Sequence, residues 1–335
     1  MERTELPVAV FDSGLGGISV LRALVRRMPG EDFLYFGDSA NAPYGVRPAA
    51  EVRELTQSVI ARLYARGIKA AVIACNTATS AAIGTLRAAL GLRRLTVVND
   101  FTALALALPA LGDDDLVRVG GGEARAAAAR ALIGAGTGLG VSGLLPVPGG
   151  WVPLQGEGGH VSLPASTPRE ANLIALLAER YGHVSAERVL SGPGLVALHD
   201  ALRRLDGLPA RELDSATISA RGLAGQCPVC TETLHLFCAL LGTVAGDLAL
   251  TLGARGGVFV GGGIVPRLGE FFARSAFRER FLAKGRFRSY LETIPTRVIR
   301  APYAALTGAA HALDTPFAVG FDSRAPLCAS TPPLA

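Results

Sequence analysis

The first hundred residues alternate between short apolar runs and longer stretches with apolar residues three and four positions apart. Apolar runs begin near residues 8, 32 and 69 and soon end in polar residues, and runs of this length predict buried strands. The stretches 17–28 and 49–67 show the wider spacing, which predicts amphipathic helices. Strands that alternate with helices in this order pair into a parallel sheet.

The same alternation continues to residue 111 and then gives way to a different pattern. Residues 85–91 are predicted to form a helix, 93–100 a strand and 101–111 a helix. From 112 to 155 the chain is rich in glycine and holds only short apolar runs. This pattern is typical of strands that pair as hairpins.

Later segments carry clear helix and turn signals. Thr167, followed by Pro168 and Glu170, predicts a capping box with proline at the first helical position and a helix that runs to about Tyr181. Residues 256–277 combine an apolar run, a glycine turn and a periodic stretch, which predicts a strand followed by a helix.

The composition describes a globular chain with a large core. The 335 residues are enough for two domains, 50% are hydrophobic, and the mean hydropathy is +0.36. The net charge is +5, but the basic residues are scattered and aromatic residues make up 6%, so no nucleic-acid-binding surface is predicted. The most apolar stretch, 236–264, contains Asp247 and Arg255, which disfavours a membrane span. No signal peptide is recognised, and a cytoplasmic protein is predicted.

The five cysteines are few and unevenly spread, as expected in a reducing compartment. Cys227 and Cys230 form a CxxC pair that opens an apolar helical pattern. Such a pair is either redox-active or half of a metal site, but no second CxxC follows. A structural role at the start of a helix is therefore the favoured interpretation.

Three motifs stand out in the N-terminal part of the chain. They are FDSGLGG (11–17), FGDSANAPYG (36–45) and ACNTATS (74–80). Together they resemble the first part of the glutamate/aspartate racemase family, in which one cysteine removes the α-proton of an amino acid and a second returns it, without a cofactor. The resemblance assigns eight residues to such a site: Asp12, Ser13, Pro43, Tyr44, Gly45, Cys75, Asn76 and Thr77.

Racemisation needs two thiols on opposite faces of one carbon, because a single base can only return the proton to the face it left. The family's second cysteine stands in a Gly-Cys-Thr-His motif, which this chain lacks. Cys227 is followed by Pro-Val-Cys and Cys238 by Ala-Leu-Leu, so neither replaces it. We therefore expect Cys75 to be a buried thiol or the remnant of a racemase half-site.

A second set of motifs extends over about two thirds of the chain, from about residue 85 to about 313. It comprises VVNDFTALALALPAL (97–111), GAGTGLG (134–140), PLQGEGGHVSL (153–163), YGHVSAERVLSGPGL (181–195), VFVGGGIVPR (258–267) and GRFRSYLETIP (285–295). These motifs are similar to bacterial ATP-dependent glucokinases, a hexokinase-like group with an actin-type ATPase fold.

The two resemblances together imply an α/β protein with two parts. The larger part would have the actin-like ATPase (ribonuclease H-like) fold of glucokinases, preceded by a racemase-like parallel α/β half-lobe. The expected boundaries are residues 1–84 for the racemase-like segment and 85–320 for the glucokinase-like domain. Residues 321–335, rich in prolines and small residues, are predicted to fray.

The glucokinase resemblance implies a sugar site. It gives Asp100 the role of general base, which accepts the proton of the glucose 6-hydroxyl; the alternative for Asp100 is a helix N-cap beside Asn99. Hydrogen bonds to the sugar hydroxyls are assigned to Asn99, Glu157, His160 and Glu187. Carboxylates with one amide and one imidazole suit a polyol. Taken singly, Glu187 could instead be a first-turn residue and His160 a turn histidine.

The phosphates of ATP must be bound largely by backbone groups. The chain has only two lysines, Lys69 and Lys284, and no GxxxxGK[ST] motif, which excludes a P-loop. Glycine-rich turns can offer backbone N–H groups to anionic oxygens, although a glycine-rich hairpin without a ligand is also possible for the first of them. The residues assigned to ATP are Gly134, Gly136, Thr137, Gly138, Gly261, Gly262 and Gly263. The resemblance implies Mg²⁺ as well, with no protein ligand assigned to it.

The N-terminus departs from the glucokinase pattern. That family begins with an Asp-x-Gly-Gly-Thr-Asn loop that holds Mg²⁺ and the β- and γ-phosphates. Here Asp12 and its following glycines resemble the loop in outline, but Ile18 and Ser19 replace the Thr-Asn pair. Three hypotheses therefore stand: a glucokinase, a racemase with a half-site at Cys75, and a catalytically impaired fusion that binds sugar or nucleotide. The glucokinase is favoured, with glucose as the partner and a homodimer as the assembly that the family often forms.

Overall fold

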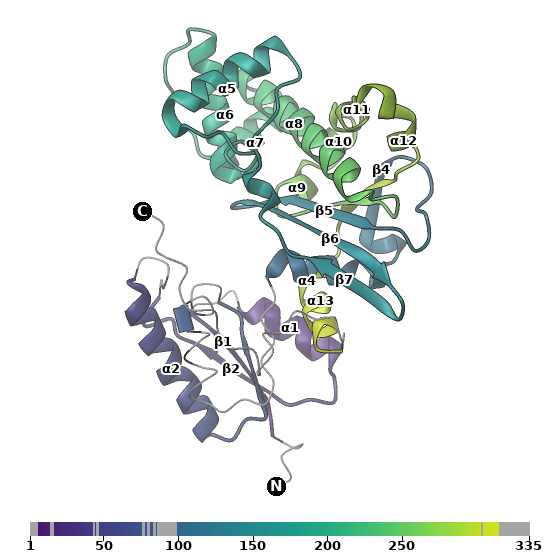
Figure 1. Cartoon of the computed structure of the whole chain (residues 1–335). Coiled ribbons are helices and arrows are strands. Elements are labelled where there is room, and N and C mark those ends of the chain that lie inside the picture. The colour runs from purple at the N-terminus through teal and green to yellow at the C-terminus, as the bar shows by residue number, and fades with distance from the viewer. Residues whose placement is uncertain are drawn as a thin grey trace. The chain divides into compact units, whose positions relative to one another are not determined.

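A computed structural model describes residues 6–13, 17–42, 44, 47–75, 78, 81–82, 85, 99–302 and 304–314. These residues form two compact units (Figure 1). The described residues before 98, together with 309–314, make up the small unit, and residues 99–308 make up the large unit. Since residues 86–98 are outside the described part, the predicted boundary at 84/85 stays a prediction, as does the tail at 321–335.

The small unit is built on a three-stranded parallel sheet. Strands β1 (Val8–Asp12), β2 (Phe33–Gly37) and β3 (Ala70–Ile73) lie in the order β2-β1-β3, as the alternation of strands and helices predicted. Helix α1 spans Gly17–Arg27 and α2 spans Ala49–Ala65. Helix α2 buries one face, formed by Val52, Thr56, Val59, Ile60 and Leu63, whose spacing of three and four is that of an amphipathic helix.

The large unit contains a six-stranded mixed sheet in the order β4-β9-β8-β5-β6-β7. Its strands are β4 (Leu116–Gly120), β5 (Arg130–Ala135), β6 (Leu139–Val147), β7 (Gly150–Leu154), β8 (Val258–Gly261) and β9 (Thr296–Ile299). The predicted hairpins are confirmed for β5-β6 and β6-β7, which are antiparallel. Strand β4 instead pairs antiparallel with β9 at the far edge, while β8 pairs parallel with both β5 and β9.

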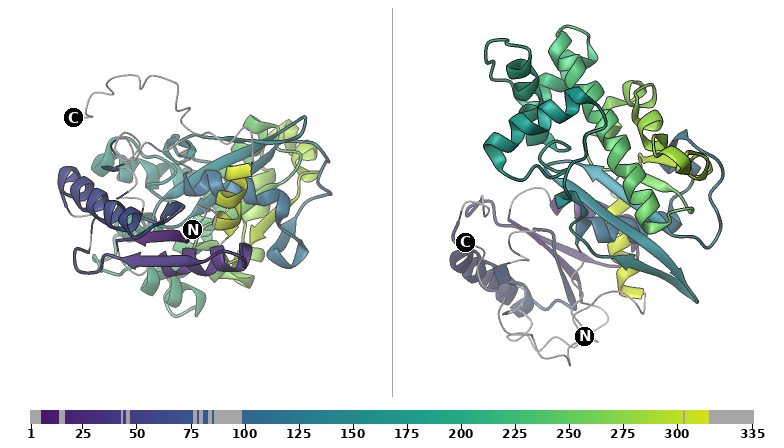
Figure 2. Two further views of the ribbon diagram at one scale, coloured as in Figure 1. Left: turned by 90° about the horizontal axis from the view of Figure 1, so that it is seen from below. Right: turned by 45° about the horizontal axis from the view of Figure 1, so that its top comes forward.

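Helices gather beside this sheet (Figures 1 and 2). The longer ones are α4 (Asp100–Ala107), α5 (Pro168–Tyr181), α6 (Gly192–Leu205), α7 (Ser215–Leu223) and α8 (Pro228–Leu252), while α13 (Ala304–Asp314) is divided between the two units. Short ones are α9 (Val265–Leu268), α10 (Glu270–Ala273), α11 (Phe277–Leu282) and α12 (Arg288–Glu292), with 3-10 turns η3 (Leu108–Ala110), η4 (Asp113–Asp115), η5 (Gly158–His160) and η6 (Gly285–Phe287).

Helix α8 is the central helix of the large unit. By length and apolar composition it could cross a membrane, but 72% of its most apolar window is buried within the protein. Phe237 and Leu241 on α8 share one core with strands β5 and β8, and Asp247 pairs with Lys284 at 2.5 Å. This is the environment of a core helix.

Helix α5 begins and ends where the sequence predicted. Thr167 is its N-cap, and the Thr167 hydroxyl accepts the N–H of Glu170 at 3.2 Å. The Glu170 carboxylate accepts the N–H of Ser166 at 2.7 Å and also binds Arg280. Glu170 therefore links the start of α5 to α11 as well as capping its own helix.

Two other predictions meet the structure differently. The strand and glycine turn of residues 256–277 are present, but the helix that follows is broken into α9 and α10 at Gly269, where φ is +51°. That left-handed conformation ends an α-helix, because it cannot continue the i to i−4 hydrogen bonds. The helix predicted for 85–91 and the strand predicted for 93–100 lie outside the described residues except for residues 85, 99 and 100. At the end of the predicted strand, Asp100 is instead the first residue of α4, with Asn99 as its N-cap.

Candidate functional site

The first residue of β6 connects two predicted sugar-binding segments. The Leu139 N–H donates to Oε2 of Glu187 at 2.8 Å, and the Glu187 N–H donates to the carbonyl of Gly159 at 2.9 Å. A Cβ added to Gly159 would lie 2.1 Å from the Leu139 carbonyl oxygen, so only glycine allows this contact. Glu187 and the turn at 157–160 are therefore held against the start of β6.

The N-terminus of α4 reaches the same part of β6. The Phe101 ring packs directly on Gly140, since a Cβ added there would lie 2.0 Å from Cδ2 of the ring. Asn99 is the N-cap of α4, and its Oδ1 accepts the N–H groups of Phe101 at 2.9 Å and Thr102 at 3.2 Å. Asp100 is the first helical residue and is exposed. Asn99 is thus the N-cap, although Oδ1 of Asp100 also accepts the Phe101 N–H at 2.9 Å, and the Asp100 side chain is otherwise exposed.

The structure brings the five predicted sugar-site residues to one region of the large unit. Asn99, Asp100, Glu157 and His160 are exposed and Glu187 is half-buried. The His160 N–H donates to the Glu157 carbonyl at 3.0 Å, which shapes the η5 turn. The segments that meet at Leu139 and Gly140 thus carry three carboxylates, an amide and an imidazole, a set of donors and acceptors suited to a polyol.

Sequence reasoning missed a serine that fixes one of these residues. Ser191 is buried and caps α6, where its hydroxyl accepts the N–H of Gly194 at 3.0 Å. The same hydroxyl donates to the carbonyl of Glu187 at 2.9 Å. The Ser-Gly-Pro-Gly run at 191–194 is a helix-start signal that pointed to it.

The two predicted phosphate-binding turns lie side by side. The carbonyl of Gly136 accepts the N–H of Gly192 at the start of α6, at 2.8 Å. Gly262 has φ +81°, and a Cβ added to it would lie 2.3 Å from the carbonyl oxygen of Ala135. The Ile264 N–H donates to that same oxygen at 3.1 Å. The turns at 134–138 and 261–263 and the start of α6 therefore form one glycine-rich corner.

Backbone N–H groups are available at this corner. Within the described part of the chain, the N–H groups of Thr137, Gly138, Gly262 and Gly263 have no hydrogen-bond acceptor. Clustered N–H groups that are not used within the fold can bind anionic oxygens. The one lysine of the large unit, Lys284, is paired with Asp247. The geometry thus fits a site in which backbone groups bind phosphate.

The small unit gathers several racemase-like residues at the carboxyl ends of its strands. Ser13 Oγ and Cys75 Sγ lie 3.1 Å apart, and the Ala78 N–H donates to Cys75 Sγ at 3.4 Å. Asp12 is buried at the end of β1, and its carbonyl accepts the N–H of Asp38 at 2.9 Å. Cys75 is only 8% exposed, which confirms the expected buried thiol. Of the residues assigned to this site, Pro43, Gly45, Asn76 and Thr77 lie outside the described residues.

Asp38 joins this group although it was not singled out from the sequence. It follows β2 and is buried; its Oδ2 accepts the hydroxyl of Tyr44 at 2.7 Å, and Asn41 Nδ2 donates to the same carboxylate at 3.0 Å. Burial raises the pKa of Tyr44, and the hydrogen bond to Asp38 raises it further. A carboxylate directly after a predicted strand, in FGDS, was the available signal.

A family model and curated relatives identify the family of this chain. A family model described as glucokinase matches residues 38–316. A glucokinase of Aromatoleum aromaticum is 62% identical over 239 residues, 71% of this chain and 72% of that protein. A glucokinase of Neisseria meningitidis is 49% identical over 232 residues, 69% of this chain and 71% of that protein.

A solved structure has the same fold. The crystal structure of a glucokinase from an Antarctic psychrotroph is 35% identical in sequence and superposes with a TM-score of 0.67. The match covers 80% of this chain and 88% of that one. The mixed α/β architecture is therefore that of the actin-like sugar kinases.

Proposed function

Because the chain belongs to the glucokinase family, we propose that it transfers the γ-phosphoryl group of ATP to the 6-hydroxyl of glucose, with Asp100 as the general base. The observation that carries the assignment of the base is the start of α4. There Asn99 is the N-cap, Oδ1 of Asp100 accepts the Phe101 N–H, and the exposed Asp100 side chain keeps Oδ2 as an acceptor beside the Phe101–Gly140 contact. A carboxylate in that position can accept the hydroxyl proton as the oxygen attacks phosphorus.

Glucose would be oriented by the side chains around residues 138–140. Glu187 is held through Leu139 and Gly159, so its carboxylate has little freedom before the sugar binds. Glu157 and His160 extend from the η5 turn, and Asn99 retains its Nδ2 as a donor while Oδ1 caps α4. Groups held in place in this way reduce the entropy lost when the substrate is positioned.

ATP would be bound at the glycine-rich corner formed by 134–138, 261–263 and the start of α6. The N–H groups of Thr137, Gly138, Gly262 and Gly263 would donate to phosphate oxygens. Thr137 is exposed, and its hydroxyl adds a further donor. Mg²⁺ would accompany the nucleotide and neutralise charge on the phosphates.

The racemase-like motifs remain a proposal about the small unit alone. The parallel order β2-β1-β3 and the contact of Ser13 with Cys75 support the resemblance. Racemisation is not favoured as the activity, because the sequence lacks the second cysteine motif that proton return to the other face requires.

We further propose a cytoplasmic enzyme that acts as a homodimer and binds neither nucleic acid nor membranes. Light scattering of the purified protein tests the assembly.

The decisive experiment is glucose-dependent release of ADP from MgATP. We expect release by the wild-type protein, a loss of at least about a hundredfold in kcat for Asp100→Asn, and no change for Asp114→Asn, an exposed aspartate of the same unit. The shift of the melting temperature by glucose, measured on the same samples, separates binding from turnover. A shift without turnover in the wild-type protein would favour the impaired fusion, in which the altered N-terminal loop no longer serves the phosphates.

A further inference from the structure

The first turn of α8 holds two thiols in different environments. Cys227 is the N-cap of the helix and is half-buried, whereas Cys230 has no exposed surface. Residues 223–226 and Pro228 around Cys227 are exposed. Cys227 is therefore within reach of small molecules in solution, and Cys230 is shielded from them.

The two cysteines face each other across the first turn of the helix. The N–H of Cys230 donates to Cys227 Sγ at 3.4 Å. Both cysteines are in the reduced, unbridged form. Residues three apart on a helix have Cβ atoms about 5–6 Å apart, so a shift of about 1–2 Å brings the pair to the Cβ separation of a disulfide bond.

The surroundings of the two thiols differ, so that Cys227 is suited to be the attacking nucleophile and Cys230 the resolving thiol. Burial raises the pKa of Cys227, but hydrogen bonds from Cys230 and Val229 and the charge of Arg211 outweigh it, so this pKa is lowered. Burial, followed by the bond to Cys227, raises the pKa of Cys230 to about 11. An accessible thiol of low pKa beside a protonated, buried one is the arrangement of reactive CxxC pairs.

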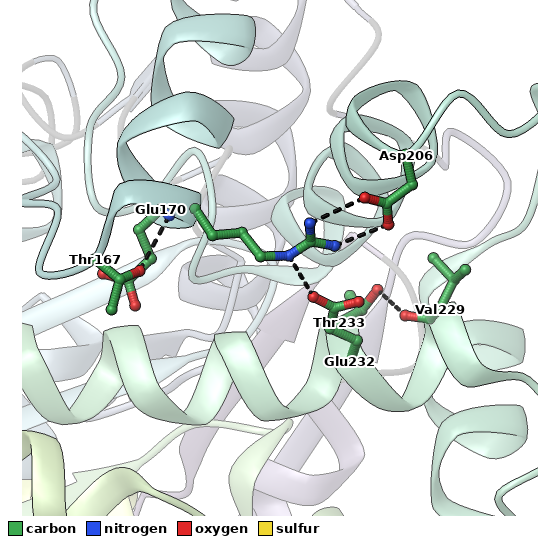
Figure 3. A network of polar contacts seen from close by, with 7 residues as sticks. Thr167, Glu170, Asp206, Val229, Glu232 and Thr233 are labelled. Carbon is green, nitrogen blue, oxygen red and sulfur yellow. Dashed lines mark hydrogen bonds and ion pairs between the residues drawn. The ribbon is translucent and has the colours of Figure 1, made fainter.

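The turn that carries the pair is anchored on two sides. Arg169 of α5 binds Asp206 at 2.8 and 2.9 Å and Glu232 of α8 at 2.7 Å. Figure 3 shows Asp206 and Glu232 in this polar network, next to Val229 and Thr233 of the same turn of α8. On the α7 side, the Thr231 hydroxyl donates to the carbonyl of Gly222 at 3.1 Å. The backbone around the two cysteines is thereby held while their side chains react.

Two other roles for the pair fit the structure less well. The described residues contain no group of three or more metal-binding side chains, so no partners for a metal site accompany Cys227 and Cys230. A purely structural thiol would resemble Cys238, further along α8, which is buried with its pKa raised to about 12 by burial. Cys227 differs from Cys238 in both exposure and acidity.

We propose that Cys227 and Cys230 form a redox-active dithiol that low-molecular-weight disulfides close reversibly to a disulfide bond. The Cys227 thiolate attacks one sulfur of the external disulfide, forms a mixed disulfide and releases one external thiolate. Cys230 then loses its proton to solvent and its sulfur attacks Cys227 Sγ, which releases the second external thiolate. Two electrons pass from the cysteines to the external disulfide, and an external dithiol reverses the reaction. This chemistry does not depend on phosphoryl transfer.

The test uses the full chain with Cys328→Ala, so that a thiol outside the described residues does not exchange. The protein is equilibrated with mixtures of reduced and oxidised glutathione, quenched in acid, alkylated with iodoacetamide and analysed by peptide mass spectrometry. We expect a Cys227–Cys230 disulfide whose amount follows the glutathione ratio and returns to zero with excess dithiothreitol. Near neutral pH, Cys227 should be alkylated at least about tenfold faster than Cys238.

Single variants separate the two thiols. Cys230→Ser should retain glutathione on Cys227, Cys227→Ser should leave Cys230 unmodified, and the control Cys238→Ser should form the disulfide like the parent. Serine also caps helices, so Cys227→Ser is expected to stay folded, and thermal unfolding of each variant checks this. Persistence of both thiols as alkylated cysteines at every glutathione ratio would overturn the proposal. Equal glutathionylation of the two single variants would do so as well.

Discussion

The carboxylate of Glu187 accepts the backbone N–H of Leu139 at 2.8 Å. This bond joins a predicted sugar-binding residue to the strand that follows the glycine-rich turn at 134–138. The Oε2 atom makes this bond, and in the described part of the chain Oε1 has no partner. One oxygen thus holds the side chain in place while the other can accept a sugar hydroxyl. Stability and glucose binding should therefore respond differently to substitutions at this position.

Replacement of Glu187 by Gln or Ala should separate these two roles. Glu187→Gln keeps an acceptor for Leu139, so stability should change little, while KM for glucose rises about tenfold through loss of a charged hydrogen bond. Glu187→Ala leaves the Leu139 N–H unpaired and should also lower the free energy of unfolding by about 1–2 kcal/mol. Urea unfolding and kinase kinetics measure both, with the exposed Glu179→Gln as control. Equal stability of the two variants would argue against the Leu139 bond.

Gly138→Ala should displace the Glu187 carboxylate without changing Glu187 itself. A Cβ at residue 138 would lie 2.6 Å from Glu187 Oε2, which is too close, so the side chain must move. We expect kcat/KM for glucose to fall by about tenfold or more. Gly150→Ala is the control, because a Cβ there meets no atom within 4 Å. Unchanged kinetics in Gly138→Ala would show that Glu187 is not positioned for the sugar.

The buried pair of Glu170 and Arg280 should dominate the acid stability of the large unit. The Glu170 side chain is 1% exposed and binds both Nη atoms of Arg280, at 2.5 and 3.0 Å. Glu170→Gln leaves the buried guanidinium without its counter-charge and should cost about 3 kcal/mol in the free energy of unfolding. The exposed pair Glu270–Arg274 provides the control: Glu270→Gln should change stability by less than about 0.5 kcal/mol.

The same pair predicts the direction of the pH dependence. Burial raises the pKa of Glu170, but hydrogen bonds from Arg280 and Ser166 outweigh it, and this pKa is lowered from its ordinary value of 4.5. The resulting stabilisation is complete above pH 4.5 and is lost as the pH falls toward the lowered pKa. The free energy of unfolding, measured at several pH values and plotted against pH, should therefore fall more steeply below pH 4.5 for the wild-type protein than for Glu170→Gln. Parallel curves would contradict a shifted Glu170.

Cys75→Ala should leave glucose phosphorylation intact. The thiol is buried and bonds to Ser13 and to the Ala78 N–H, so its loss should lower the free energy of unfolding by about 1 kcal/mol. Turnover with saturating glucose and ATP should remain within about twofold of wild type. A loss of turnover at unchanged stability would instead give Cys75 a chemical role. Exchange of the α-proton of glutamate, measured by NMR in deuterated water, checks for residual racemase chemistry.

Local signals predicted much of the fold because they act over a few residues. The three parallel strands of the small unit follow from apolar runs that alternate with helical spacing. The limits of α5 follow from Thr167 and Pro168 at one end and Gly182 at the other. Each of these signals is a hydrogen bond or a burial pattern within one element, so neighbouring residues in the chain are sufficient to read it.

Pairings between distant parts of the chain carried no such signal. Strand β4 was expected to continue a hairpin, yet it pairs with β9, far along the sequence. Asn99, and not Asp100, is the N-cap because α4 begins at Asp100. The packing of Phe101 on Gly140, which lies in a different element, stabilises this starting point. Both outcomes are decided by which surfaces can be buried together, and residue spacing does not specify that.

By itself, then, the sequence determined the strands, the helix starts and the residue types that a sugar and a nucleotide require. Only the tertiary structure decided that the segments carrying Asp100, Glu157 and Glu187 meet at Leu139 and Gly140 and that the turns at 134–138 and 261–263 form one corner. The physical reason is that these meetings depend on close backbone approaches between separate elements. Such approaches exist only once the sheet and its helices have packed.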